Sequence, residues 1–304
     1  MFDGIDELVL PAPDLNPLVS LYRDRLGFAL VSDDVPDPRW GALWGLTEAP
    51  TREVLLGKPH SAGGWIRLVE APGLPSPAPA GRPDRPGPYA LDFYLRDAAA
   101  TEDDVTEHGG DFLSEAVHYS LPGTDIPVRE RMLAQPHSGL LHAFVQYRPR
   151  GTRCVIDHDS TEAVSEVVAA VFLTDDLPGA RRFATDVLGA HPYFDGRFDG
   201  PAVERMLGLV PGEGFTGTLF RGPGSRNARL EFAETVPGRR RDPEQVRRVV
   251  AVCTMDDLDG LAGRLAGSEH GHLSGDLTLD GIRHIGFTSR YGATFVFRER
   301  RALA

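Results

Sequence analysis

An internal repeat constrains the fold of this chain more than any other feature of its sequence. A short pattern of acidic, leucine and glycine residues recurs 162 residues later in the same order. The matched positions are Asp14-Leu15, Asp24 and Leu26-Gly27 in the first copy, and Asp176-Leu177, Asp186 and Leu188-Gly189 in the second. The same offset carries Arg67 onto Arg229, so the correspondence spans more than fifty residues. We therefore predict that the two halves of the chain are homologous.

A similar pattern appears within each half. Residues 5–15, 89–97 and 249–257 alternate apolar and polar side chains, end in acidic residues, and lead into a helical pattern. This predicts an α+β protein of four units, each with a strand, a helix and further strands. We expect the units to pair within each half, giving one domain over residues 1–150 and a second over residues 161–304, with the halves meeting near residues 148–161.

Composition narrows the range of partners. The formal net charge of -12 disfavours binding to nucleic acid or to acidic membranes. No run approaches the roughly 18 apolar residues of a membrane helix, and the N-terminus lacks the pattern of a signal peptide. The only two cysteines, Cys154 and Cys253, fit a reducing compartment and have no metal-binding spacing. We expect a cytoplasmic monomer or homodimer whose partner is a small molecule.

The chain resembles the vicinal oxygen chelate superfamily, which includes glyoxalase I, bleomycin-resistance proteins and extradiol dioxygenases. The residues that carry the resemblance are Ile5 to Leu10 with Asp14-Leu15, Tyr22 to Phe28, Phe183 to Gly189, and Ser138 to Leu141. The resemblance implies four βαβββ modules paired into two glyoxalase-like domains. It also implies that each domain curves into a cup, which in the family commonly holds a divalent metal.

Mapping the family's metal-ligand positions onto the first half gives an unusual set. The position that is normally the first histidine falls on Glu7, the next on Arg67 and the third on Ala90. The fourth falls on His142 or Ala143, and we choose His142 because Leu141, Ala143 and Val145 form an apolar face suited to packing on a helix. By the same alternation Asp92, Tyr94 and Phe144 face the cup. A standard metal site is therefore absent.

Three interpretations of this set remain open. Glu7 and His142 could exchange protons with a substrate while Arg67 binds an anionic group of that substrate. Alternatively, Glu7, Asp92 and His142 could bind a divalent metal, although Arg67 would bring a positive charge close to it. In the third interpretation Glu7 and Arg67 form a structural ion pair. No cofactor is predicted firmly, and a divalent metal in the N-terminal cup is the alternative.

The corresponding positions in the second half are Ala169, Arg229, Val250 and either Phe295 or Val296. Only the arginine is polar, so we predict that this cup holds no metal. Arg229 and Glu231 lie on one strand face and are expected to pair with each other.

These observations favour a protein of the glyoxalase/dioxygenase type that acts on a small organic metabolite in the N-terminal cup. We expect proton-transfer, isomerase or lyase chemistry by Glu7, His142 and Arg67, with Asp92, Tyr94, Phe144 and Trp44 contacting the substrate. The alternative is a non-catalytic protein that binds a drug between aromatic walls. A metal-dependent dioxygenase is a third interpretation. It is disfavoured because the family places its iron in the C-terminal cup.

Overall fold

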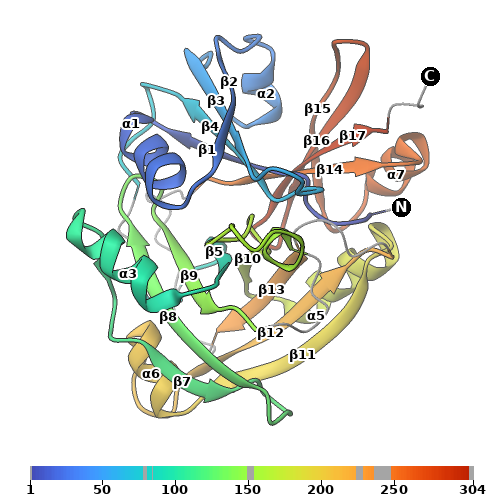
Figure 1. The fold of residues 1–304 in the computed structure, drawn as a ribbon. Coiled ribbons are helices and arrows are strands. Elements are labelled where there is room, and N and C mark those ends of the chain that lie inside the picture. The colour runs from blue at the N-terminus through green and yellow to red at the C-terminus, as the bar shows by residue number, and fades with distance from the viewer. Residues whose placement is uncertain are drawn as a thin grey trace.

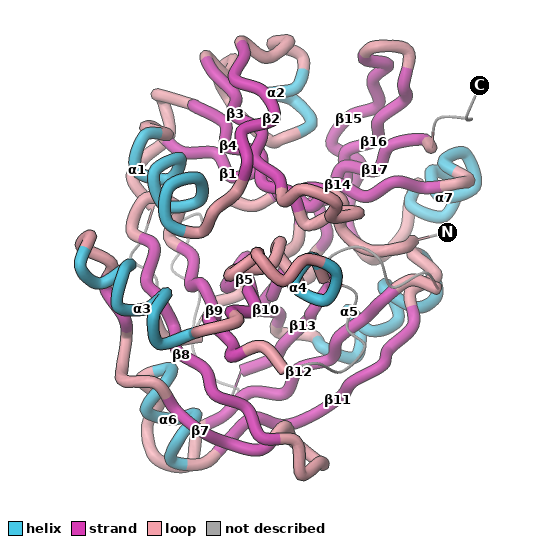
Figure 2. Tube along the Cα trace, viewed as in Figure 1, coloured by secondary structure: helices cyan, strands magenta, loops and turns pink. Residues whose placement is uncertain are grey.

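The computed structural model describes residues 2–77, 81–83, 85–148, 154–223, 229–235 and 248–300. Strands make up most of the two layers, and the helices are short (Figure 2). The α+β prediction is confirmed. Within the described residues, the longest and most apolar helices fall short of what crossing a membrane requires.

The elements follow one another in four groups, which we call modules 1 to 4. Module 1 contains β1 (Glu7–Ala12), α1 (Asn16–Val19), β2 (Ala29–Asp34), α2 (Trp40–Leu43), β3 (Arg52–Gly57) and β4 (Trp65–Glu70). Module 2 contains β5 (Gly87–Leu95), α3 (Ala98–Glu107), β6 (Asp111–Phe112), β7 (Val117–Ser120), β8 (Pro127–Gln135) and β9 (Leu140–Gln146). The short helix α4 (Val155–His158) follows module 2.

The second half repeats this order. Module 3 contains β10 (Ala169–Thr174), α5 (Leu177–Arg182), β11 (His191–Asp199), α6 (Pro201–Leu207), β12 (Gly214–Arg221) and β13 (Arg229–Thr235). Module 4 contains β14 (Val250–Met255), α7 (Leu258–Leu265), β15 (Gly271–Leu279), β16 (Ile282–Ser289) and β17 (Thr294–Glu299).

The Leu-Gly pairs of the sequence repeat lie where helices end. A π-helical segment, Ser20–Arg25, continues α1, and the equivalent segment Phe183–Val187 continues α5. The next residues are Leu26-Gly27 and Leu188-Gly189, and both glycines adopt left-handed conformations with φ of 69° and 71°. Glycine takes this conformation without the steric cost of a Cβ, so each pair ends its helix and turns the chain toward the next strand.

The modules pair across the two halves, which differs from the prediction. One sheet, the terminal sheet, has the order β15-β16-β17-β14-β1-β4-β3-β2 and combines modules 1 and 4. The other, the middle sheet, has the order β11-β12-β13-β10-β5-β9-β8-β6, with β7 on β8, and combines modules 2 and 3. Figure 1 shows the blue strands of module 1 beside the orange and red strands of module 4.

The prediction that each half forms its own cup is therefore wrong. The first strands of the paired modules join the sheets: β1 runs antiparallel to β14, and β5 runs antiparallel to β10. All four first strands have similar apolar, alternating sequences, so no single strand specifies its partner module. The boundary near residues 148–161 marks the sequence repeat, but it does not separate the two sheets. Residues 149–153 of this predicted junction lie outside the described residues.

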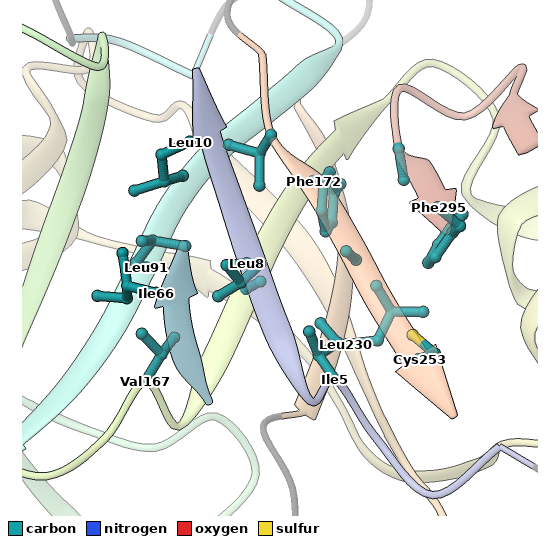
Figure 3. Packing of buried hydrophobic residues seen from close by; sticks show 14 of the residues in the cluster. Ile5, Leu8, Leu10, Ile66, Leu91, Val167, Phe172, Leu230, Cys253 and Phe295 are labelled. Carbon is teal, nitrogen blue, oxygen red and sulfur yellow. The ribbon is translucent and has the colours of Figure 1, made fainter. Parts of the chain in front are cut away.

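One hydrophobic core fills the space between the sheets. Every first strand contributes alternate residues to it, for example Leu8 on β1, Leu91 on β5 and Phe172 on β10. Figure 3 shows these side chains packed together with Ile66 and Leu230. We call this side of each sheet its core face and the opposite side its cup face. The cup faces carry two separate hydrophobic clusters, so a binding site has to be sought there.

Candidate functional site

The cup face of the middle sheet contains a cavity of about 430 Å³. Its walls come from both modules of that sheet: β5 and β8 from module 2, and β10, β11, β12 and β13 from module 3. Helix α6 closes one side with Met206 and Leu207. This volume suits a small organic ligand.

Most of the cavity wall is apolar and aromatic. Phe198 stacks on Phe215 with 4.7 Å between ring centroids, and Tyr119 contacts the edge of Phe198. Val171 and Met132 add aliphatic surface and belong to the same buried cluster. Such walls favour an apolar ligand body, because contact removes apolar surface of both partners from water.

Three carboxyl groups face this apolar cavity from three strands: Asp92 on β5, Glu130 on β8 and Glu231 on β13. Burial raises the pKa of Asp92 to about 7, and repulsion by Glu130 adds to the effect while Arg229 opposes it. Burial also raises the pKa of Glu130 to about 7. The pKa of Glu231 lies well above its usual range because of burial and then repulsion by Asp92 and Glu130. The three groups therefore disfavour one another's ionisation.

Hydrogen bonding distinguishes the three carboxyls. The hydroxyl of Tyr119 on β7 donates a hydrogen bond to the Glu130 carboxyl. This bond favours the ionised form of Glu130 and partly offsets the rise in its pKa that burial causes. Within the described part of the chain, the carboxyl groups of Asp92 and Glu231 have no hydrogen-bond or ion-pair partner. A buried polar group without a partner is costly, so these two are open to a partner from outside the chain.

Arg229 provides the positive charge at this end of the cavity. Its Nε donates to the carbonyl oxygen of Val168 at 2.8 Å, and its Nη2 donates to the hydroxyl of Tyr94 at 2.9 Å. The guanidinium also lies over the rings of Tyr94 and Tyr193. The predicted hydrogen-bonded pair between Arg229 and Glu231 is therefore replaced by contacts to Tyr94 and to the backbone.

The structure separates the residues that were predicted to share one cavity. Asp92 and Tyr94 do face a cup, as the alternation of β5 predicted. Glu7 and Arg67 lie in the terminal sheet, on its cup face. His142 belongs to β9 of the middle sheet. The predicted metal-ligand set Glu7, Asp92 and His142 is therefore not brought together.

His142 lies on the core face and not on the cup face, which corrects the register predicted for β9. It is fully buried, bonds through Nε2 to the hydroxyl of Tyr22 at 2.7 Å, and stacks on Tyr22 and Phe93. Burial lowers its pKa to about 4, so the ring is neutral at pH 7. Phe144 lies on the same core face. An acid–base pair of Glu7 and His142 is incompatible with this arrangement.

Glu7 is instead the centre of an ion-pair network. Its Oε2 accepts from Nε and Nη2 of Arg67 at 2.9 and 2.8 Å, and its Oε1 accepts from Arg298 at 2.6 Å. Arg67 also donates to Glu53 at 2.9 Å. Burial disfavours the ionised form of Glu7, but the two arginines outweigh it and lower its pKa. This geometry matches the structural ion-pair interpretation and adds two members to it.

The cup face of the terminal sheet is packed with apolar side chains around this network. Trp44 is buried there and stacks on Trp40, with 5.3 Å between the ring centroids. Val9 and Val250 belong to the same cluster. Trp44, at the end of α2, therefore packs against the terminal sheet and does not contribute to the walls of the middle-sheet cavity.

A metal does not fit the cavity. Across the described ranges, no group of three or more His, Cys, Asp and Glu residues is arranged to hold a metal ion. The cavity donors are carboxyls alone, with the Arg229 guanidinium close enough to affect Asp92 and Glu231. We therefore derive no step that uses a metal.

Comparison with known proteins agrees with this fold. A family model described as Glyoxalase/Bleomycin resistance protein/Dioxygenase superfamily matches residues 4–126. The structure of glyoxalase I from Zea mays has a TM-score of 0.67, covers 98% of this chain and 92% of its own, and is 15% identical. The family model covers less than half of the chain, and at this identity the likeness to glyoxalase I concerns the fold alone.

Two other solved structures have a similar fold. A mutant of glyoxalase I from Zea mays has a TM-score of 0.68 at 15% identity, covering 98% of this chain and 92% of that one. A proposed dioxygenase from Bacillus subtilis has a TM-score of 0.62 at 14% identity and covers 99% of this chain and 86% of its own. A search of curated protein sequences gives no match. At these identities the likeness concerns the fold, and the chemistry of this protein has to be inferred from its own residues.

Two carboxyls of the cavity were not assigned to a site from the sequence. Glu130 alternates with Val128 and Met132 along β8, and a charged residue in an otherwise apolar alternation was the available signal. Glu231 was noticed only as a partner for Arg229.

Proposed function

We propose that this protein binds a small organic molecule in the cavity of the middle sheet and transfers protons to and from it with Asp92 and Glu130. The observation that supports the proposal is the convergence of three carboxyls on one apolar cavity. The proposed site lies in the middle sheet, and not in the N-terminal cup expected from the sequence. The proposed class of chemistry is still proton transfer, isomerisation or elimination.

The protonation of these carboxyls suits such chemistry. A pKa of about 7 for both Asp92 and Glu130 means that each group is present in both forms near neutral pH. A general base must be ionised and a general acid protonated, and both work best when the pKa lies near the working pH. Tyr119 orients Glu130 through its hydrogen bond. Among the described residues no side chain donates such a bond to Asp92, so its carboxyl can contact a ligand directly.

A second candidate function is binding without reaction. The walls formed by Phe198, Phe215 and Val171 support it, because burial of apolar ligand surface alone can hold a molecule there. In that case the carboxyls contribute only to recognition.

The experiment begins with a screen of small organic molecules by ligand-observed NMR, on the wild type and on Val171→Trp. Tryptophan at position 171 projects into the cavity, so a ligand of this site binds the wild type and is lost from the variant. Thermal unfolding verifies that the variant is folded. If every ligand found also binds Val171→Trp unchanged, the cavity is not the site.

Mass spectrometry of the bound compounds then tests for reaction. Asp92→Asn and Glu130→Gln should each lower turnover by about 10² to 10⁴-fold, the usual contribution of a general acid or base. The matched control is Glu115→Gln, which removes a carboxylate whose side chain is 97% exposed. Turnover that is unchanged in both cavity variants would refute the catalytic roles. Binding with no product in the wild type would leave the second candidate function.

A further inference from the structure

We propose that the ligand of the middle-sheet cavity carries a positively charged ammonium group on an apolar body, and that Asp92, Glu130 and Glu231 bind this ammonium group. This inference rests on the proposed function, because it assigns a chemical class to the molecule bound there. It is carried by the geometry of the cavity and by a buried carboxyl for which the described residues supply no hydrogen bond or ion pair.

Glu231 is that carboxyl. It is 6% exposed and lines the cavity. No hydrogen bond or ion pair to it is found among the residues that the structure describes. The neighbouring Gly217 makes room for it, since a Cβ at position 217 would clash with Glu231 Oε1. A side chain placed this way has its remaining free space in the cavity, where a ligand would lie.

Two arginines line the cavity, Arg148 and Arg229, and Arg229 is the one that affects the pKa of Asp92 and Glu231. Arg229 lowers the pKa of Asp92 and of Glu231, but its Nε and Nη2 donate to Val168 and Tyr94. The guanidinium is also held over two tyrosine rings. Since these contacts hold Arg229, its guanidinium does not neutralise the carboxyls by a direct hydrogen bond. A cationic ligand group would favour the ionised carboxyls, whereas an anionic group would favour the protonated ones.

The walls suit the rest of such a ligand. Tyr119, Phe198 and Phe215 present aromatic surface within the same cavity as the carboxyls. Aromatic faces attract cations and also cover apolar ligand surface. An amine with an aromatic or aliphatic body therefore meets a complementary surface at both of its ends, whereas a highly polar ligand would leave most of the wall without a partner.

Binding of a cation should be coupled to proton release. Apart from the three carboxyls, the titratable or charged groups facing the cavity are Tyr89, Tyr94, Tyr119, Tyr193, Arg148 and Arg229. Tyrosine and arginine side chains ordinarily titrate well above pH 8. An ammonium group favours the ionised carboxyls, so protons leave Asp92, Glu130 or Glu231 when it binds. Affinity should accordingly rise as the pH rises through about 7.

The test uses three probes with the same body and different charge: 2-phenylethylamine, 2-phenylethanol and phenylacetate. Calorimetric or NMR titrations at pH 7.5 compare them on the wild type, on Glu231→Gln and on Glu115→Gln. The amine should bind the wild type at least about 10-fold more tightly than the alcohol, since hydrogen bonds to charged groups are the stronger ones. Glu231→Gln should lower the affinity for the amine severalfold while Glu115→Gln leaves it unchanged.

Titration of the amine at pH 6.8 in two buffers with different ionisation enthalpies measures the protons exchanged. We expect net proton release in the wild type and less release in Glu231→Gln. Equal or tighter binding of the alcohol or of phenylacetate would overturn the proposed ligand class and leave the cavity as a binding site. Failure of all three probes to bind, or binding unaffected by Val171→Trp, would overturn the proposed site as well.

Discussion

Replacing Glu130 with glutamine should make the protein more stable at alkaline pH and leave its stability at acid pH nearly unchanged. Glu130 is 7% exposed, and burial raises its pKa from an ordinary 4.5 to about 7. In the unfolded chain the carboxyl ionises from about pH 4.5 upward, whereas in the folded protein it keeps its proton up to about pH 7. Between these values the folded state binds more protons, so stability falls as the pH rises.

The magnitude follows from this difference in pKa. A change from 4.5 to about 7 corresponds to roughly 3 kcal/mol of unfolding free energy, lost progressively between those pH values. Glutamine does not titrate, and its carbonyl oxygen can still accept the hydrogen bond from Tyr119. Glu130→Gln should therefore gain up to about 3 kcal/mol relative to the wild type at pH 8. For 304 residues this corresponds to a rise in Tm of roughly 5 °C.

The assay is urea and thermal unfolding of the wild type, Glu130→Gln and the exposed control Glu115→Gln at half-unit steps from pH 4.5 to 8.5. The difference between Glu130→Gln and the wild type should grow with pH and level off above about pH 7.5. A difference that is constant with pH, or that grows toward acid pH, would show that Glu130 is ionised in the folded protein and that the reasoning is wrong.

Two further predictions concern the residues that the structure places outside the cavity. Glu7→Gln should destabilise the protein by about 2–3 kcal/mol in urea unfolding at pH 7, because Arg67 and Arg298 lose their shared carboxylate. Ligand binding in the middle sheet should be unchanged. A variant as stable as the wild type would contradict the ion-pair network. His142→Phe should reduce the loss of stability that the wild type undergoes as the pH falls from 6.5 toward 4, because the buried, neutral imidazole gains a proton on unfolding. An identical pH profile would show that burial does not lower the pKa of His142.

The elements of the fold were predictable from the sequence, and the pairing of the modules was not. Alternation and the Leu-Gly helix ends are local signals, because a strand or a helix end depends on a few neighbouring residues. Which first strand joins which is a long-range choice among four similar sequences. Glu7 on β1 lies opposite Val252 on β14, and neither side chain prevents pairing with the first strand of another module.

The candidate site shows the same division. The alternation of β5 correctly placed Asp92 in a cup, because its other face, with Leu91 and Phe93, is purely apolar. On β9 both faces are largely apolar, and His142 was placed in the cup because Leu141, Ala143 and Val145 were expected to pack on a helix. In the structure a tyrosine from a distant helix, Tyr22, bonds to Nε2 of His142 within the core, while no partner for Nδ1 is found among the described residues. Polarity alone does not identify the exposed face of a strand when another segment supplies the hydrogen bond.

The pairing of modules has a consequence for how the chain assembles. The middle sheet is built from one continuous stretch, residues 87–235, nested within a terminal sheet whose β1 and β14 are more than two hundred residues apart. Closing such a long loop is slow, whereas β5 and β10 are much nearer in the sequence. During synthesis the middle-sheet cavity can form before β14 leaves the ribosome. Module 1 can complete the terminal sheet only after module 4 has been synthesised. Truncation of the C-terminal strands should therefore expose module 1 first.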